Sequence, residues 1–215
     1  MKKRIFNLII IDESGSMQSI KTETINNVNE TIQTIRLAQT QYEDQEHFVS
    51  LVSFNSNVKT IYDCVPVSEV KELTEDDYSP SYLTALYDAM GLSLGALRPK
   101  VADVDKVLVT VVTDGCENAS KEFRGDVIKW LINELKAKGW VFAYIGANHD
   151  VEGCASKISI TNTWNFTATG AGVAAMGEKL NSARGKMYRA IAKDVFSADE
   201  ANEDFFDDDN DNDEW

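Results

Sequence analysis

Two patterns of apolar residues alternate along this chain. Short, nearly continuous apolar runs are typical of strands that are buried on both faces of a parallel sheet. Such runs occupy residues 4–11, 107–113, 140–145 and 161–166. Apolar residues at helical spacing follow several of these runs and predict amphipathic helices. The predicted helices cover about 17–42, 86–97, 127–139, 149–157 and a long final segment around 176–191.

Two further strand-like segments are predicted to form a hairpin. Residues 47–54 and 58–65 are separated only by Asn55-Ser56-Asn57, a short polar connection that suits an antiparallel pair. Together with the alternating strands and helices, this hairpin predicts an α/β fold of the doubly wound, Rossmann-like type. We expect a mostly parallel six-stranded sheet with one antiparallel edge strand, right-handed crossovers and helices on both faces.

Charge divides the chain into a domain and a tail. The formal net charge is −14, but residues 199–215 hold ten acidic and no basic residues, so positions 1–198 carry 25 acidic against 21 basic residues. We therefore predict one domain over residues 1–196 and an acidic, disordered tail over 197–215. This charge disfavours binding to nucleic acid and to anionic membranes.

Cysteine usage and the amino-terminal residues favour a cytoplasmic protein. Cys64, Cys116 and Cys154 are widely spaced and odd in number, which predicts reduced thiols and neither a disulfide framework nor a zinc site. The run 5–11 meets Asp12-Glu13 without a small-residue cleavage site and is interpreted as a strand, not a signal peptide. No run reaches the roughly 18 apolar residues that a membrane span needs.

Candidate chemistry lies where two predicted strands end. Asp12-Glu13-Ser14-Gly15-Ser16 follows the first strand, and Asp114-Gly115 follows the strand over 107–113. If these strands are neighbours, both carboxylates lie at the carboxyl edge of the sheet, where open α/β folds bind ligands. Two close anions need a cation between them or ample hydrogen bonding. Oxygen ligands without His or Cys favour a hard divalent ion: Mg²⁺ first, with Mn²⁺ or Ca²⁺ as alternatives.

The pattern Asp12-x-Ser14-x-Ser16, then Thr84, then Thr113-Asp114-Gly115 resembles the metal-ion-dependent adhesion site of von Willebrand factor A domains. The resemblance covers about residues 4–195. It implies that the hydroxyls of Ser14, Ser16 and Thr84 bind the metal, with Asp12 and Asp114 bound directly or through water. An acidic residue of a protein partner then completes the coordination. Family sequences often carry glycines before this threonine, whereas here the preceding run is 79–83, and Ser79 or Ser81 is an alternative ligand.

Three other interpretations compete with a metal-dependent binding module. Ser14 and Ser16 can cap a helix while Asp114-Gly115 forms an ordinary turn. A magnesium-dependent phosphohydrolase of the haloacid-dehalogenase type also has an Asp after its first strand, but it needs a second Asp at position 14. A serine hydrolase is disfavoured because no G-x-S-x-G surrounds Ser14 and neither His47 nor His149 lies in a catalytic motif.

We therefore expect a binding module and not an enzyme. Because no secretion signal is recognised, the chain looks like the stand-alone bacterial-type members of the family, placed in the cytoplasm. The sequence names neither the partner nor the oligomeric state.

Overall fold

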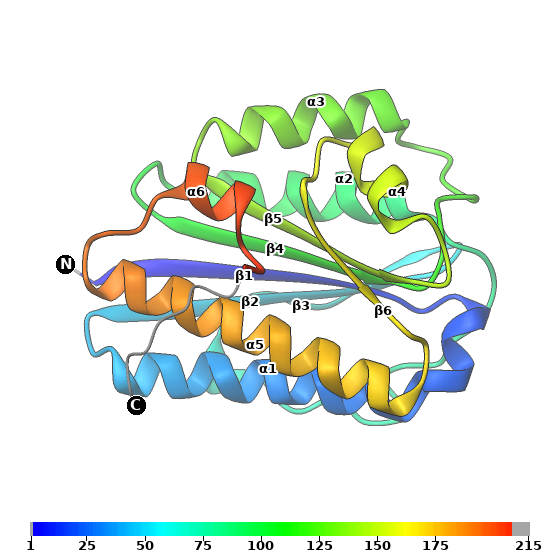
Figure 1. The fold of residues 1–215 in the computed structure, drawn as a ribbon, viewed down its shortest axis with the longest axis horizontal. Coiled ribbons are helices and arrows are strands. Elements are labelled where there is room, and N and C mark those ends of the chain that lie inside the picture. Colours follow the sequence, from blue (N-terminus) through cyan, green and yellow to red (C-terminus); the bar gives the residue numbers. More distant parts are fainter. Residues whose placement is uncertain (1, 208–215) are drawn as a thin grey trace.

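The computed structural model describes residues 2–207 and contains a six-stranded sheet in the order β3-β2-β1-β4-β5-β6 (Figure 1). Its strands are β1 Lys3–Asp12, β2 Gln45–Phe54, β3 Val58–Pro66, β4 Lys106–Thr113, β5 Trp140–Ala147 and β6 Asn162–Phe166. All neighbouring strands run parallel except β2 and β3, which form the predicted antiparallel hairpin. The predicted fold class is confirmed, and most strand bounds lie within two residues of the prediction.

Helices cover both faces of this sheet. They are α1 Lys21–Gln41, α2 Leu86–Leu97, α3 Gly125–Lys136, α4 Val151–Lys157, α5 Gly170–Ala192 and α6 Ala198–Glu203. Figure 1 shows α1 and α5 side by side under the sheet, with α2, α3 and α4 above it. The first helical turn differs from the prediction, because Gly15–Ile20 forms a 3₁₀ helix before α1 begins. Within the described residues, no helix has the length and apolarity to cross a membrane.

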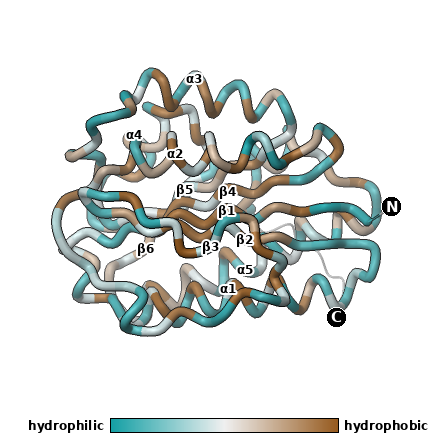
Figure 2. Tube along the Cα trace, turned by 180° about the vertical axis from the view of Figure 1, so that it is seen from behind, coloured by the Kyte–Doolittle hydropathy of each residue, from teal (hydrophilic) through white to brown (hydrophobic). Residues whose placement is uncertain are grey.

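The central strands are the most apolar part of the chain (Figure 2). All eight residues of β5 are buried, as are the last eight of β1. One hydrophobic cluster joins the sheet to α1 and α5, and a second joins it to α2, α3 and α4. Burial on both faces explains why these strands have continuous apolar runs without the alternation of half-exposed strands.

A buried polar network fixes α5 on the sheet. Arg184 is fully buried, and its guanidinium donates to Asn7 Oδ1 at 3.2 Å and to Thr110 Oγ1 at 2.6 Å. The Tyr188 hydroxyl donates to the same Asn7 oxygen at 2.5 Å. Because buried polar groups are costly unless they are hydrogen-bonded, these contacts favour one position of α5 over others.

His47 lies beside this network and makes the fold sensitive to acid. Its ring is fully buried, stands edge-on to Tyr188, and has Nε2 3.0 Å from Gln45 Oε1. Burial, helped by the charge of Arg184, lowers the pKa of His47 to about 4. Between the ordinary histidine pKa and this value, the unfolded chain takes up a proton that folded His47 does not. Stability attributable to His47 is therefore present above pH 6.5 and is lost as the pH falls towards 4.

We predict that lowering the pH from 7 to 4.5 costs the native protein about 2 to 3 kcal/mol more than it costs a His47→Gln variant. Urea unfolding of both proteins at the two pH values measures this difference, and carboxyl groups common to both cancel in the subtraction. Equal losses in the two proteins would contradict the assigned role of His47.

The start of the predicted disordered tail is ordered. Residues 198–203 form α6, and Ser197 caps it by accepting a hydrogen bond from the Glu200 N–H. The side chain of Asn202 accepts from Phe142 N–H and donates to the Trp140 carbonyl, so it continues the hydrogen bonding of β5. Phe205 and Phe206 are buried in the core. The prediction of disorder is therefore wrong for residues 198–207, whereas residues 208–215 lie outside the described part.

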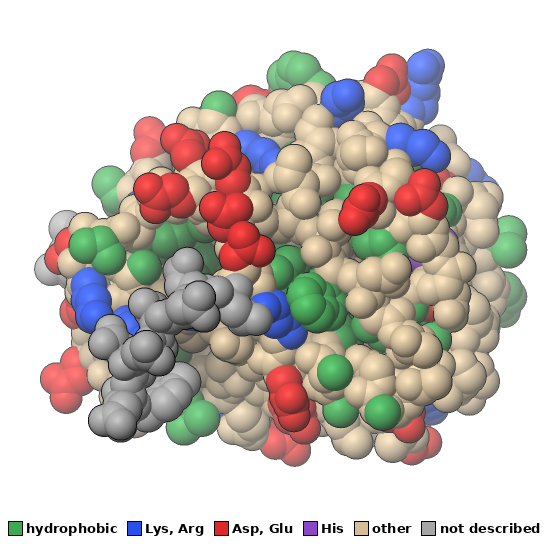
Figure 3. Space-filling model, in the orientation of Figure 1, with side chains coloured by type: hydrophobic (Ala, Val, Ile, Leu, Met, Phe, Trp, Pro, Cys, Tyr) green, Lys and Arg blue, Asp and Glu red, His purple; other side chains and the backbone are tan. Residues whose placement is uncertain are grey.

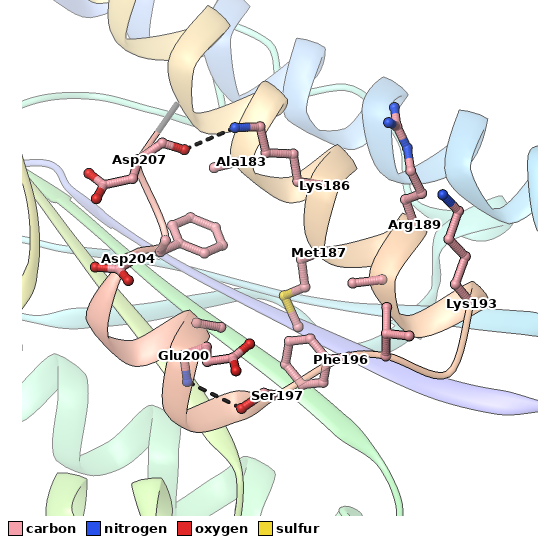
Figure 4. A pocket seen from close by; sticks show the side chains of 14 residues that line it. Ala183, Lys186, Met187, Arg189, Lys193, Phe196, Ser197, Glu200, Asp204 and Asp207 are labelled. Atoms are coloured by element: carbon pink, nitrogen blue, oxygen red, sulfur yellow. Dashed lines mark hydrogen bonds between the residues drawn. The ribbon is translucent and has the colours of Figure 1, made fainter. Parts of the chain in front are cut away.

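Acidic residues of this segment remain at the surface (Figure 3). The segment and the last turns of α5 enclose a pocket with basic side chains on its α5 wall (Figure 4). Lys186 Nζ crosses it to donate to the Asp207 carbonyl at 2.9 Å. The segment thus buries its apolar residues while its carboxylates stay in solvent, a combination that a net-charge argument does not anticipate.

The prediction of three reduced cysteines is also wrong. Cys116 and Cys154 form a disulfide, with Cα atoms 6.4 Å apart, and only Cys64 among the three is a free thiol. The Cα separation lies within the range that disulfide geometry requires. The bond joins the loop after β4 to α4, across 38 residues of sequence. Spacing in the sequence carried no sign of this proximity.

Candidate metal centre

The two aspartates meet because β1 and β4 are adjacent parallel strands. In their register Ile11 pairs with Val112, so Asp12 and Thr113-Asp114 follow at the same carboxyl edge. This edge lies at the right-hand end of the sheet in Figure 1, where β1 leads into the 3₁₀ helix. β2 and β4 lie on opposite sides of β1, so the connections leaving β1 and β4 diverge and leave room for a site.

Asp12 is fully buried, and both of its carboxylate oxygens are hydrogen-bonded. Oδ1 accepts from the Ser14 N–H at 2.7 Å, and Oδ2 accepts from the Thr113 hydroxyl at 2.6 Å. Burial raises the pKa of Asp12 to about 6 despite these hydrogen bonds, and the charge of Asp114 contributes to the rise. The carboxylate is thus held in place, but within residues 2–207 no Lys or Arg forms an ion pair with it.

Ser14, Ser16 and Asp114 form a chain of oxygen atoms next to Asp12. The Ser14 and Ser16 hydroxyl oxygens are 3.2 Å apart, and the Ser16 hydroxyl donates to Asp114 Oδ1 at 2.6 Å. Asp114 is buried, which raises its pKa, while the hydrogen bond from Ser16 partly lowers it. Ser16 itself is exposed, so the oxygen cluster opens to solvent on that side.

Thr84 also reaches this edge. It is buried just before α2, and a Cβ atom on Gly115 would lie 3.6 Å from the Thr84 hydroxyl oxygen. The Thr84 N–H donates to Asn118 Oδ1 at 2.9 Å, and its carbonyl accepts from the Asn118 N–H at 3.0 Å. The structure therefore brings Thr84 to the Asp114 turn, as the sequence predicted.

The alternative ligands Ser79 and Ser81 lie in a loop that is fixed by other contacts. Ser79 N–H donates to Glu13 Oε1 at 2.5 Å, and Ser81 N–H donates to the Glu13 carbonyl at 2.8 Å. The Ser81 hydroxyl is 3.4 Å from Asn55 Nδ2 and donates to the Ser79 carbonyl at 3.2 Å. These contacts direct the Ser81 hydroxyl to its own loop, which favours Thr84 as the ligand.

Sequence reasoning missed the residues that hold Thr84 and Asp114 together. No side chain preceding α2 caps that helix; the Tyr87 N–H donates instead to Glu117 Oε2 at 2.9 Å, and the Asp88 N–H donates to Ser120 Oγ at 3.0 Å. The loop after β4 therefore caps α2, satisfying N–H groups that a helix start leaves open.

Asp88 completes this connection from the helix side. Its carboxylate accepts from the backbone N–H groups of Lys121, Glu122 and Phe123 at 2.8–2.9 Å. The loop that carries Asp114 thus accepts hydrogen bonds from the start of α2, and α2 accepts hydrogen bonds from that loop through Asp88. The only sequence signal was an unpatterned polar run after Asp114-Gly115, too weak to assign these roles.

This donor set fits a hard divalent cation. Two buried carboxylates and three hydroxyl groups lie at one edge, and within residues 2–207 no Lys or Arg forms an ion pair with Asp12 or Asp114. Buried carboxylates without a cation are costly, and a bound divalent ion removes that cost. Oxygen ligands of this kind match Mg²⁺, Mn²⁺ or Ca²⁺.

No family model matches this sequence, and a search of curated proteins finds no match. Solved structures do resemble it. Proximal thread matrix protein 1 from the mussel byssus aligns with a TM-score of 0.58 at 15% identity, over 84% of this chain. A von Willebrand factor type A protein from Catenulispora acidiphila gives 0.55 at 11% identity, also over 84%. The PilB minor pilin from Streptococcus sanguinis gives 0.58 at 11% identity, over 91%.

These similarities show that the fold is shared with von Willebrand factor A domains. The alignments cover 46% of the mussel protein, 42% of the Catenulispora protein and 63% of the pilin, so this chain matches only part of each.

Proposed function

We propose that this chain is a metal-dependent protein-binding module. Asp12, Ser14, Ser16, Thr84 and Asp114 hold one divalent cation, and an Asp or Glu of a partner protein binds to that cation. The observation that carries the proposal is the pair of buried carboxylates, Asp12 and Asp114, which are joined to hydroxyl groups and form no ion pair with a Lys or Arg within the described residues.

Mg²⁺ is the cation that we propose. The ligand set contains few carboxylates and several neutral hydroxyls, which suits an ion that keeps water in its shell. One structure of the mussel protein, aligned at 14% identity, is described as having a zinc-occupied MIDAS motif. That neighbour supports a divalent-metal site in this fold, while the all-oxygen donor set here favours a harder ion.

The surroundings of the centre support a protein as the ligand. Tyr82 and Leu83 are large apolar residues with 73% and 56% of their surface exposed, and they immediately precede Thr84. The Tyr82 carbonyl accepts from the Gly15 N–H at 3.1 Å, which places it beside the serine loop. Exposed aromatic and aliphatic side chains next to a polar anchor are typical of protein interfaces.

Binding without catalysis is part of the same proposal. Position 14, where a haloacid-dehalogenase-type enzyme carries its second carboxylate, is Ser14, whose hydroxyl lies 3.2 Å from that of Ser16. Asp12, which such an enzyme would use as nucleophile, has both oxygens engaged by Ser14 and Thr113. These contacts support a ligand role for Asp12 over a nucleophilic one.

Replacing Ser14 with alanine tests the proposal. We expect Ser14→Ala to lower Mg²⁺ affinity about tenfold or more and to abolish Mg²⁺-dependent capture of partner proteins, because one hydroxyl ligand is lost. The Ser14 N–H still donates to Asp12 in this variant, so the fold should persist. Calorimetric Mg²⁺ titration measures the affinity, and pull-downs in Mg²⁺ and in chelator measure the capture.

Ser19→Ala is the matched control. Ser19 lies in the 3₁₀ helix that follows Ser14 but is exposed, and its hydroxyl makes a long contact, 3.4 Å, to the Ser16 carbonyl. It should bind Mg²⁺ and partners like the native protein. Capture that is equal in Mg²⁺ and chelator, or that survives Ser14→Ala, would show that the metal does not mediate binding.

A further inference from the structure

Three potential ligands for a soft metal gather beside the candidate metal centre and take no part in it. Cys116 follows β4, His149 follows β5, and Cys154 belongs to α4. Their ligand atoms all lie within 4.8 Å of one another, and none of the three residues is buried. A tetrahedral zinc site places neighbouring ligand atoms about 3.5 to 3.8 Å apart, given its usual bond lengths. The two sulfur atoms, which are bonded to each other in the disulfide, must move apart to reach that spacing.

The histidine is oriented as metal-binding histidines are. Its Nδ1 lies 2.6 Å from the Ala147 carbonyl oxygen. A carbonyl can only accept, so Nδ1 is the donor of this hydrogen bond, and in the neutral tautomer with that donor the lone pair lies on Nε2. Histidine ligands commonly donate their other N–H to a backbone carbonyl in this way, which fixes the ring. Nε2 has only a 3.3 Å contact to the Tyr144 hydroxyl, longer than a normal hydrogen bond.

Gly146 leaves the space that this ring occupies. A Cβ atom at Gly146 would lie 2.7 Å from His149 Cε1 and 3.1 Å from Nε2, closer than ordinary contacts. Gly146, the last residue but one of β5, is therefore small where the imidazole packs against the sheet. The Ala147 carbonyl and the space left by Gly146 together fix the His149 ring beside the two cysteines.

We propose that Cys116, His149 and Cys154 bind one Zn²⁺ when the disulfide between the two cysteines is reduced. Two thiolates and an imidazole are the ligands that zinc prefers, and three protein ligands leave a fourth position for water or another ligand. The site uses other residues than the oxygen-lined centre, although His149 lies close enough for its charge to lower the pKa of Asp114, and it does not depend on the function proposed for that centre.

The disulfide and the zinc site exclude each other. A phosphine reductant breaks the Sγ–Sγ bond, takes an oxygen atom from water to become a phosphine oxide, and leaves one hydrogen of that water on each sulfur. Zn²⁺ then replaces the two thiol protons, which buffer accepts. In a reducing compartment the dithiol form is favoured, and in an oxidising one the disulfide. Both the disulfide and the zinc-bound form connect Cys116 to Cys154 of α4.

Cobalt spectroscopy of the full chain tests this proposal. After phosphine reduction, one equivalent of Co²⁺ should produce a thiolate-to-cobalt charge-transfer band, and one equivalent of Zn²⁺ should remove it. The oxidised protein should show no band. Oxygen ligands cannot give this signal, so binding at the Asp12 centre is not mistaken for it. A reduced native protein without the band would overturn the proposal.

Variants assign the ligands. Cys154→Ser and Cys116→Ser should each lose the band, and His149→Gln should lower Co²⁺ affinity about 10- to 100-fold. Cys64→Ser is the matched cysteine control and should keep the band, since Cys64 lies in the edge strand β3. Asp12→Asn should also keep it. Unchanged affinity in His149→Gln, or a band lost in Cys64→Ser, would refute the three-ligand site; circular dichroism confirms that each variant is folded.

Discussion

Asp12→Asn is expected to lower Mg²⁺ affinity roughly a hundredfold or more, and at the same time to make the metal-free protein more stable. The loss of affinity follows from removing a carboxylate at the centre of the site. The gain in stability follows from the environment of Asp12, which is fully buried without a positively charged partner among the described residues. A residue retained for binding is thus costly for the metal-free fold.

The sign of this stability change follows from the pKa of Asp12. Burial raises that pKa to about 6, above the ordinary value of 3.8. As the pH rises from about 4 to 6, the unfolded chain loses the proton more readily than the folded one, which destabilises the native protein. At pH 8 the full difference is worth about 3 kcal/mol, and the neutral Asn avoids it. The variant's advantage should therefore grow from pH 4 and level off above pH 6.

Asparagine can keep the local contacts of Asp12. Its Oδ1 can accept from the Ser14 N–H, and its amide can donate to Thr113 Oγ1, whose hydroxyl also reaches the Gly115 carbonyl at 2.9 Å. Urea unfolding in chelator at pH 8 and pH 4, then in saturating Mg²⁺, measures both effects. Mg²⁺ at 100 times its dissociation constant should add about 2.7 kcal/mol to the native protein and much less to the variant.

Asp103→Asn provides the control, because Asp103 is exposed and precedes β4 at the opposite edge of the sheet. It should change neither stability nor the response to Mg²⁺. An Asp12→Asn protein that is less stable than the native one at pH 8 in chelator would show that the carboxylate is better compensated than its burial indicates. A normal Mg²⁺ response would remove Asp12 from the metal centre.

Local patterns were sufficient to predict the fold and the edge that carries the candidate site. A parallel strand buried on both faces leaves an unmistakable apolar run, and β1 and β4 each end such a run at a carboxylate. Adjacency of those strands, which the structure confirms, was the one assumption needed to bring Asp12 and Asp114 together. Ser14 and Ser16 were predicted to lie at the site because they come directly after Asp12 in the sequence.

Contacts between loops could not be predicted, because they depend on where whole elements lie. Glu117 and Ser120 cap α2 from a loop about 30 residues away, and nothing in their spacing indicates it. The order of residues 198–207 was hidden by their acidity, although Ser197 has the chemistry of a helix cap and Phe205 that of a core residue. The composition of a segment does not show the contribution of such single residues, whereas the packing of each one decides whether the segment is ordered.

Reduction of the Cys116–Cys154 disulfide is expected to lower the free energy of unfolding by about 2 to 4 kcal/mol. The bond closes a segment with a sequence separation of 38 residues. Loop-closure entropy for a segment of that length corresponds to about 4 kcal/mol, the upper end of this range. For a protein of this size the loss should lower the melting temperature by about 5 to 15 °C. Urea unfolding with and without a phosphine reductant, in the absence of metal, measures the change.

A Cys116→Ser/Cys154→Ser double variant should reproduce the reduced protein and show no response to reductant, whereas Cys64→Ser should respond like the native chain. Zn²⁺ separates the two consequences of reduction. If the dithiol form binds zinc through His149, the metal again ties the loop after β4 to α4 and should restore part of the lost stability, in the reduced native protein but not in the double variant. An unchanged free energy of unfolding on reduction would contradict this prediction and would mean that the 116–154 bond does not lower the entropy of the unfolded chain.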